Sequence, residues 1–156
     1  GESHEGIPIE PVCASIFDLP KTFAPMTFDA VCGFFILHHL PDHEKLFRLI
    51  HESLKPGGCV AFVEPNRLNP SFLFQVMISR EMTWEAEKGM FTFSATRTVT
   101  ILQNSGFTDI QCIRFGLFPP QILDPFPGLL KVQRAVEWFR PIRRILPFVL
   151  LVAHRA

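Results

Sequence analysis

The sequence lacks tyrosine, a net charge and any close pair of cysteines, and each of these absences narrows what the chain can be. Lys and Arg number 15, as do Asp and Glu, so no excess of positive charge points to a nucleic-acid partner. No uninterrupted apolar run approaches the roughly 20 residues of a membrane span. The first residues lack the basic-then-apolar pattern of a signal peptide. We therefore expect one globular, cytoplasmic domain over residues 1–156.

The cysteines stand far apart, each within a separate apolar run, at Cys13, Cys32, Cys59 and Cys112. A disulfide framework or a zinc site would normally show close pairs such as C-x-x-C. Four buried, reduced thiols are therefore expected, and they also fit the cytoplasm.

What the sequence does contain is a clear strand–helix–strand unit. Residues 28–37 and 59–63 are apolar almost throughout, as expected of strands covered on both faces of a parallel sheet. Between them, Pro41 suits the first turn of a helix, and apolar residues recur at helical spacing up to Leu54. The 56–58 Pro-Gly-Gly stretch then stops the helix. The unit predicts a right-handed βαβ crossover with parallel strands.

The remaining elements are shorter. Apolar runs predict strands at 12–17, 109–115 and 148–153. Helical periodicity predicts helices at 71–82, from an N-cap at Ser94 to Gly106, and at 129–139, with a loop at 119–127. The predicted class is α/β.

Four segments occur in an order that resembles class I S-adenosylmethionine-dependent methyltransferases. Residues 14–20 (ASIFDLP) look like that family's G-D-x-x-D-L-P segment, and residues 28–31 with 37–42 (FDAV, LHHLPD) look like its F-D-x-V and L-H-H-L-x-D segments. Residues 54–58 (LKPGG) and 105–107 (SGF) look like its L-K-P-G-G turn and its A-G-F segment. The resemblance implies a partial Rossmann-like sheet of parallel strands closed by an antiparallel C-terminal strand, and S-adenosylmethionine as cofactor.

The same resemblance implies cofactor-binding residues. The family's acidic residue near the adenine falls on Ser15, and the neighbouring backbone N–H falls on Ile16. Gly33, Phe34 and Phe35 fall beside the methionine part of the cofactor. From the residues alone, Gly33 equally suits a close-packed strand and the two phenylalanines suit the core.

The family's glycine-rich loop has no counterpart in these residues, and neither does the acidic residue that ends the following strand. The resemblance therefore implies that the N-terminal βαβα portion of the fold is missing. In that case apolar strand edges are exposed and can pair with another chain.

Three residues are candidates for catalysis. His38 can take a proton from the acceptor, although it also suits packing at the strand–helix junction. Glu64 and Asn66 follow a strand at the carboxyl edge of the sheet, where such sheets bind ligands, although Pro65 between them equally fits a turn. His39 and His43 are four residues apart, but no third ligand is evident, so no metal is expected.

Two further segments indicate partners. Residues 71–93 are rich in Phe and Met, and a lid of this character favours a small hydrophobic acceptor, although such stripes more often belong to the core. Residues 117–147 form a loop and a basic, amphipathic helix that suits either solvent or an anionic membrane surface. The leading hypothesis is methyl transfer from S-adenosylmethionine to that acceptor. The alternative is a non-catalytic module that contacts membranes or associates with itself through open strand edges.

Overall fold

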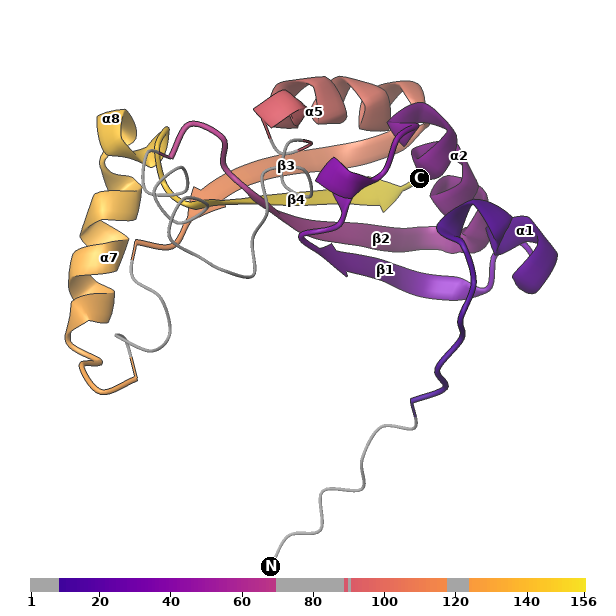
Figure 1. The fold of residues 1–156 in the computed structure, drawn as a ribbon, viewed down its shortest axis with the longest axis horizontal. Coiled ribbons are helices and arrows are strands. Elements are labelled where there is room, and N and C mark those ends of the chain that lie inside the picture. Colours follow the sequence, from indigo (N-terminus) through magenta and orange to yellow (C-terminus); the bar gives the residue numbers. More distant parts are fainter. Residues whose placement is uncertain (1–8, 70–88, 90, 118–123) are drawn as a thin grey trace, which may run out of the picture.

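The computed structural model describes residues 9–69, 89, 91–117 and 124–156, and it shows an α/β fold around one sheet. The strands are β1 (Phe28–Phe34), β2 (Leu54–Pro65), β3 (Phe107–Phe115) and β4 (Phe148–Arg155), arranged in the order β1-β2-β4-β3. Strand β1 runs parallel to β2, and β4 runs antiparallel to both β2 and β3 (Figure 1). The predicted mixed sheet, with a late antiparallel strand, is confirmed.

The predicted crossover is also present. Helix α2 (His43–Ser53) joins β1 to β2, and Val31 lies opposite Val60 in the parallel pair. The helix begins later than predicted, because the Asp42 side chain caps it by accepting a hydrogen bond from the Lys45 N–H at 2.9 Å. Pro41 therefore lies before the cap and not in the first turn. The 56–58 turn is part of the long strand β2, so the helix ends before it.

The main core lies between the sheet and two helices, α2 and α5 (Ala95–Asn104), which cover one face (Figure 1). Leu46, Phe47 and Ile50 of α2 are buried against strand residues of that face. The predicted cap at Ser94 accepts a hydrogen bond from the Arg97 N–H. Gly106, with φ of +91°, follows the helix at the predicted position, where this backbone angle favours glycine.

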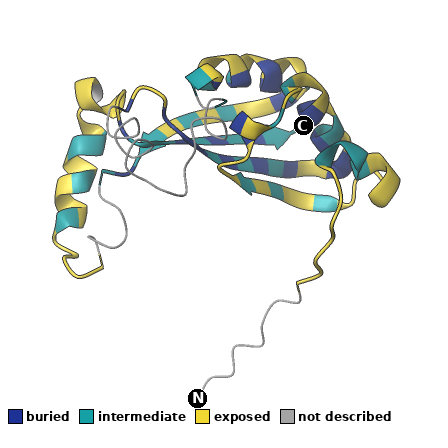
Figure 2. Ribbon diagram, viewed as in Figure 1, coloured by how far each residue is buried: buried dark blue, intermediate teal, exposed yellow. Residues whose placement is uncertain are grey.

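Burial alternates along the strands, and this departs from the prediction of strands covered on both faces. Phe62 and Glu64 are buried, whereas Ala61 and Val63 are half-buried, and β4 shows the same alternation (Figure 2). Among the described residues, helices cover only one face, so the apolar residues of the other face stay accessible. Phe34, with 70 % of its surface exposed, is the clearest case.

The predicted strand at 12–17 is wrong. This segment is irregular and ends in the 3₁₀ turn η1 (Ile16–Asp18) and the short helix α1 (Leu19–Thr22). An apolar run becomes a strand only by pairing with another, and in the described part of the chain no strand pairs with the outer edge of β1. Ile16 and Phe17 instead pack against the core.

The C-terminal helical segment lies apart from the main core. Helix α7 (Leu129–Trp138) and the short helix α8 (Arg140–Arg143) stand beyond the end of β3 and the start of β4 (Figure 1). The helix predicted at 129–139 is thereby confirmed. The helix predicted at 71–82, most of the predicted lid and part of the 119–127 loop lie outside the described residues. No described helix is both long and apolar enough to cross a bilayer.

Candidate active site

The carboxylate of Glu64 is the centre of the candidate site. It projects from the end of β2 and is completely buried. One carboxylate oxygen, Oε1, accepts hydrogen bonds from the backbone N–H groups of Ile36 at 2.9 Å and Leu37 at 2.7 Å. The other, Oε2, lies 2.6 Å from Nδ1 of His38, whose side chain is 2 % exposed. Two residues nominated separately from the sequence therefore form one buried pair.

The segment that leaves β1 is held in a fixed conformation around this pair. Phe35 has φ of +52°, an unusual angle for a residue with a large side chain, and its N–H donates to the Val63 carbonyl at 2.8 Å. The 3₁₀ turn η2 (Leu37–His39) follows. Nε2 of His43 lies 2.7 Å from the Leu37 carbonyl, so this nitrogen carries the proton and donates. Hydrogen bonds from both β2 and α2 thus position His38.

A cavity of about 230 Å³ reaches His38 from the helical side of the sheet. Its other lining residues come from residues 40–44, which lead into α2, from Gly89, from residues 92–94 and from α5. A Cβ atom on Gly89 would lie 2.1 Å from the His38 carbonyl oxygen, so only glycine permits this close approach. The cavity therefore brings small groups up to His38 without crossing the sheet.

Asn66, the third catalytic candidate, is buried and makes structural hydrogen bonds. Its amide nitrogen donates to the carbonyls of Arg144 at 2.9 Å and Leu146 at 2.7 Å, and its side-chain oxygen accepts from the Leu68 N–H at 3.2 Å. The side chain therefore joins the end of β2 to the segment before β4. A direct catalytic role for Asn66 stays a prediction.

Four of the five predicted cofactor residues line a second cavity, of about 580 Å³, at the free edge of β1. These are Ser15, Ile16, Gly33 and Phe34. The Ser15 hydroxyl caps η1 by accepting from the Phe17 N–H. Phe35 does not line this cavity, and its ring lies 5.7 Å from that of Phe148.

Gly33 is required by packing. A Cβ atom at this position would lie 2.5 Å from a ring carbon of Phe62. The close-packed interpretation of this glycine is therefore correct, and it does not conflict with a place in the cavity wall.

The cysteines differ from the prediction of four buried thiols. All four are free, but Cys13 and Cys32 are exposed, while Cys59 and Cys112 are half-buried. Cys32 is accessible because its side chain lies, like that of Phe34, on the face of the sheet that no described helix covers. Burial raises the pKa of the Cys112 thiol above its ordinary value, and nearby Arg114 partly opposes this.

A comparison with models of protein families shows the family to which this chain belongs. The family model described as "Methyltransferase domain" matches residues 4–112. The chain belongs to this family.

This methyltransferase domain also resembles curated proteins in sequence. A ubiquinone biosynthesis O-methyltransferase of Chromobacterium violaceum is 38% identical over 72 residues, which are 46% of this chain and 31% of the relative. The polyketide synthase-nonribosomal peptide synthetase TwmB of Talaromyces wortmannii is 31% identical over 108 residues, 67% of this chain and 4% of the relative. The domain thus spans about a third or less of the length of these two relatives.

Solved structures confirm the fold. A SAM-dependent methyltransferase from Archaeoglobus fulgidus has a TM-score of 0.63 at 15% identity, covering 92% of this chain and 66% of that one. A S-adenosylmethionine-dependent methyltransferase from Mesorhizobium loti has a TM-score of 0.56 at 20% identity, covering 91% and 68%. The Rossmann-like methyltransferase fold expected from the sequence is confirmed.

The 580 Å³ cavity of the methyltransferase domain suits part of a nucleoside cofactor. Its size lies within the range of small-molecule sites, and its walls are largely apolar, as a purine ring requires. Ser15 places a hydroxyl there. No carboxylate is among the residues that line this cavity, so its lining is better suited to a ring than to ribose hydroxyls.

The hydrogen bonds that join the candidate site residues of the methyltransferase domain were not predicted from the sequence. From the sequence, His43 was only a metal candidate, whereas the structure uses it to hold the Leu37 carbonyl. Across the described ranges, no three His, Cys, Asp or Glu side chains lie close enough to share a metal ion. The signal that pairs His38 with Glu64 was present: both lie at or just beyond the carboxyl ends of two strands predicted to be parallel, and such ends meet at one edge of a sheet.

Proposed function

We propose that this chain takes part in S-adenosylmethionine-dependent methyl transfer to a hydroxyl group of a small, largely apolar acceptor. The observation that carries the proposal is the buried His38–Glu64 pair at the carboxyl ends of β1 and β2, beside a cavity. A buried carboxylate hydrogen-bonded to an imidazole is an arrangement that positions a general base. Membership of the methyltransferase domain family supplies the reaction class.

In this proposal Glu64 orients and His38 accepts a proton. With the Nδ1 proton directed at the carboxylate, Nε2 is the nitrogen that carries the lone pair. S-adenosylmethionine, when bound, supplies a methyl group on a positively charged sulfur. With the cofactor bound, the acceptor oxygen would take the methyl group as the methyl–sulfur bond breaks and a neutral thioether leaves; the hydroxyl proton would pass to Nε2 of His38, and Glu64 would stabilise the imidazolium that results. Most of the rate comes from alignment of the acceptor, to which the fixed η2 turn contributes.

Two observations support an apolar hydroxyl acceptor. The curated relatives that resemble the domain include proteins named ubiquinone biosynthesis O-methyltransferases, whose acceptor atom is oxygen. Leu40, Phe93 and Ile101 give the cavity beside His38 an apolar part where an apolar acceptor can pack, although most of the other lining side chains are polar. The free thiols of Cys13 and Cys32 fit a reducing, cytoplasmic location.

The cofactor site is complete, in our proposal, only when further chain pairs with the outer edge of β1. The described residues leave that edge and the adjacent sheet face uncovered, with Phe34 and Phe35 exposed. An apolar edge of this kind favours pairing with another strand.

The same edge favours the alternative of a non-catalytic module that associates with itself. Analytical ultracentrifugation distinguishes the two, because Phe34→Lys would restore a monomer if β1 mediates self-association. A second feature favours membrane contact: Trp138, 87 % exposed, lies in a segment that also carries Lys131 and Arg134. Sedimentation with anionic vesicles tests this contact.

Transfer of labelled methyl groups tests the proposed function. The protein as its gene encodes it is incubated with methyl-labelled S-adenosylmethionine and matched phenols, amines and thiols. We expect label on phenolic oxygen, and about a 100-fold lower kcat for Glu64→Gln, within the range that general-base catalysis contributes. Asp29→Asn, which removes an exposed carboxylate bound to Lys55, should leave kcat unchanged. An unchanged kcat in Glu64→Gln would contradict the proposal that His38 and Glu64 together act as the general base.

A further inference from the structure

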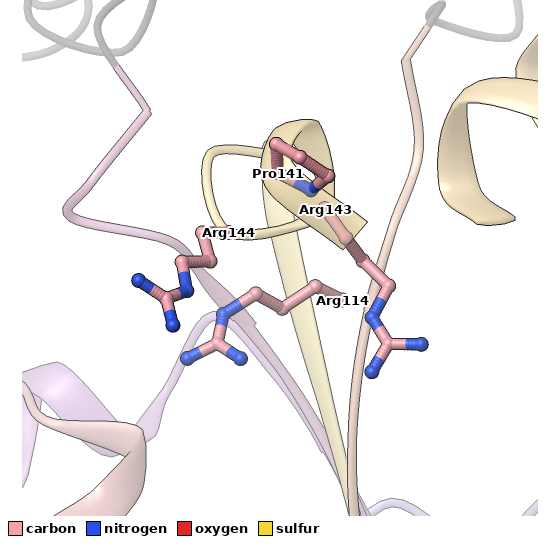
Figure 3. A pocket seen from close by; sticks show the side chains of 4 residues that line it. All are labelled: Arg114, Pro141, Arg143 and Arg144. Atoms are coloured by element: carbon pink, nitrogen blue, oxygen red, sulfur yellow. The ribbon is translucent and has the colours of Figure 1, made fainter. Parts of the chain in front are cut away.

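Three arginines from two segments of the chain line one cavity of about 620 Å³. Arg114 comes from the end of β3, Arg143 ends α8, and Arg144 follows it, with Pro141 completing the lining. Figure 3 shows the Arg114 guanidinium between those of Arg143 and Arg144. Arg143 and Arg144 were visible in the sequence only as part of a basic segment. Arg114, far upstream, joins them through the pairing of β3 with β4.

The positive charge of this cavity is not balanced within the described part of the chain. No described carboxylate forms an ion pair with any of the three arginines. Glu137 of α7 is engaged elsewhere, because its Oε1 accepts a hydrogen bond from the Gly116 N–H at 2.9 Å. Nε of Arg114 is buried and has no hydrogen-bond partner among the described residues. A buried donor without an acceptor is costly, so the site is one that an anion stabilises.

The cavity is also held in place by buried polar side chains. Asn66 donates to the Arg144 carbonyl, and the amide of Asn69 donates to the Ile145 carbonyl at 2.6 Å. Both asparagines follow β2, so the segment that carries Arg143 and Arg144 is fixed to the same edge of the sheet as the candidate active site. Arg114 is held by the β3–β4 ladder, where it lies opposite Val149. This arrangement explains why two asparagines are buried here.

We propose that this arginine cavity binds a phosphate group carried by an organic ester. Guanidinium groups match phosphate oxygens with pairs of parallel hydrogen bonds, and three of them supply more donors than a single carboxylate can accept. A phosphate near neutral pH carries up to two negative charges and balances most of the three positive ones. The site requires neither S-adenosylmethionine nor the His38–Glu64 pair, so it goes beyond the proposed methyl transfer.

Calorimetric titration of the full chain with inorganic phosphate at low ionic strength tests the site. The Arg143→Gln/Arg144→Gln double variant removes two exposed side chains and keeps the backbone carbonyl that Asn66 binds. It should bind phosphate at least about 10-fold more weakly, since hydrogen bonds to charged groups contribute more than neutral ones. The matched control, Lys131→Gln/Arg134→Gln, removes two positive charges from α7 outside the cavity and should bind like the original protein.

Two sources of the phosphate are distinguished in parallel. Soluble glycerol 3-phosphate is titrated in the same way, and phosphatidylcholine vesicles with and without phosphatidic acid are used in sedimentation. A soluble ester that binds at least as tightly as inorganic phosphate, and loses affinity in the arginine variant, identifies a small molecule. Selective loss of binding to phosphatidic acid vesicles in that variant, relative to the α7 control, identifies a lipid headgroup.

The proposal is overturned if inorganic phosphate does not bind. It is also overturned if the arginine variant and the α7 control weaken phosphate binding equally, because binding would then depend on the overall positive charge and not on the cavity. Circular dichroism of both variants verifies that they are folded. Because no methyl transfer is measured, failure of this proposal leaves the proposed function untouched, and the reverse also holds.

Discussion

Replacing Glu64 should reveal how far one carboxylate holds the site together. Glu64→Ala removes the acceptor for two backbone N–H groups and for Nδ1 of His38, all buried or partly buried. Each buried donor left without an acceptor costs about 1–3 kcal/mol. The three together, with the cavity left behind, lower the free energy of unfolding by about 4 kcal/mol or more. Since small domains are stable by only about 5–15 kcal/mol, this variant is expected to be barely folded.

Glu64→Gln separates shape from charge. The amide oxygen still accepts from the N–H groups of Ile36 and Leu37, and its NH₂ group faces Nδ1, which then accepts as the imidazole changes tautomer. Only the charge assistance is lost, and charge-assisted hydrogen bonds are roughly twice as strong as neutral ones. We therefore expect a loss of about 1–2 kcal/mol, less than half of that for the alanine variant.

Urea unfolding followed by far-ultraviolet circular dichroism measures both changes, provided that the urea dependence stays constant. Asp29→Asn is the control, because it breaks only the exposed contact with Lys55 and should change stability by less than about 0.5 kcal/mol. Equal effects of Ala and Gln at position 64, or an alanine variant within about 1 kcal/mol of the original protein, would refute this account of the junction.

Three other predictions concern His51, the asparagine at the end of β2 and the thiols. Burial, and then the nearby Arg155, lower the pKa of His51 below its ordinary value of 6.5, so protonation of His51 favours unfolding. The free energy of unfolding should therefore fall as the pH drops below about 6.5. Urea titrations at several pH values should show a shallower fall for His51→Asn. Asn66→Leu leaves the carbonyls of Arg144 and Leu146 without their donor, and thermal or urea unfolding should show a loss of about 2–4 kcal/mol; a loss below about 1 kcal/mol would contradict the role given to this amide. Alkylation at neutral pH, followed by peptide mass spectrometry, should label exposed Cys32 well before Cys112, whose thiol pKa is raised by burial; the opposite order would mean that β1 is covered in solution.

Local sequence signals predicted most of the sheet. The apolar runs at β1, β2 and β4 are long and bounded by turn residues. Between β1 and β2, the spacing of the apolar residues is that of a helix. Ser94 and Gly106 mark the ends of α5, because capping and left-handed backbone angles depend on a single residue.

Features that depend on distant partners were not predictable in this way. The run at 12–17 has strand-like residues, but whether it becomes a strand depends on a neighbour, and β1 has no second partner in the described part of the chain. The exposure of Cys32 likewise depends on what covers the second face of the sheet. The arginine cavity depends on how the β3–β4 ladder brings Arg114 to Arg143, two residues separated by most of the C-terminal segment.

The site was half-predictable for a related reason. His38 and Glu64 were each recognisable as polar groups at the ends of apolar strands, but their hydrogen bond is a property of the paired strands. The two roles of Asn66 could not be separated from the sequence, because its partners lie some 80 residues further along the chain.

Calorimetric titration of S-adenosylmethionine into the protein as its gene encodes it tests the central claim most directly. The claim is that β1 and its neighbouring segments form one wall of a cofactor site. We predict a single binding event that Phe34→Lys weakens about 10-fold or more, because a charged side chain then replaces apolar surface in the cavity wall, and that Arg134→Gln leaves unchanged. The absence of any binding, or equal affinity in the Phe34 variant, would contradict the claim.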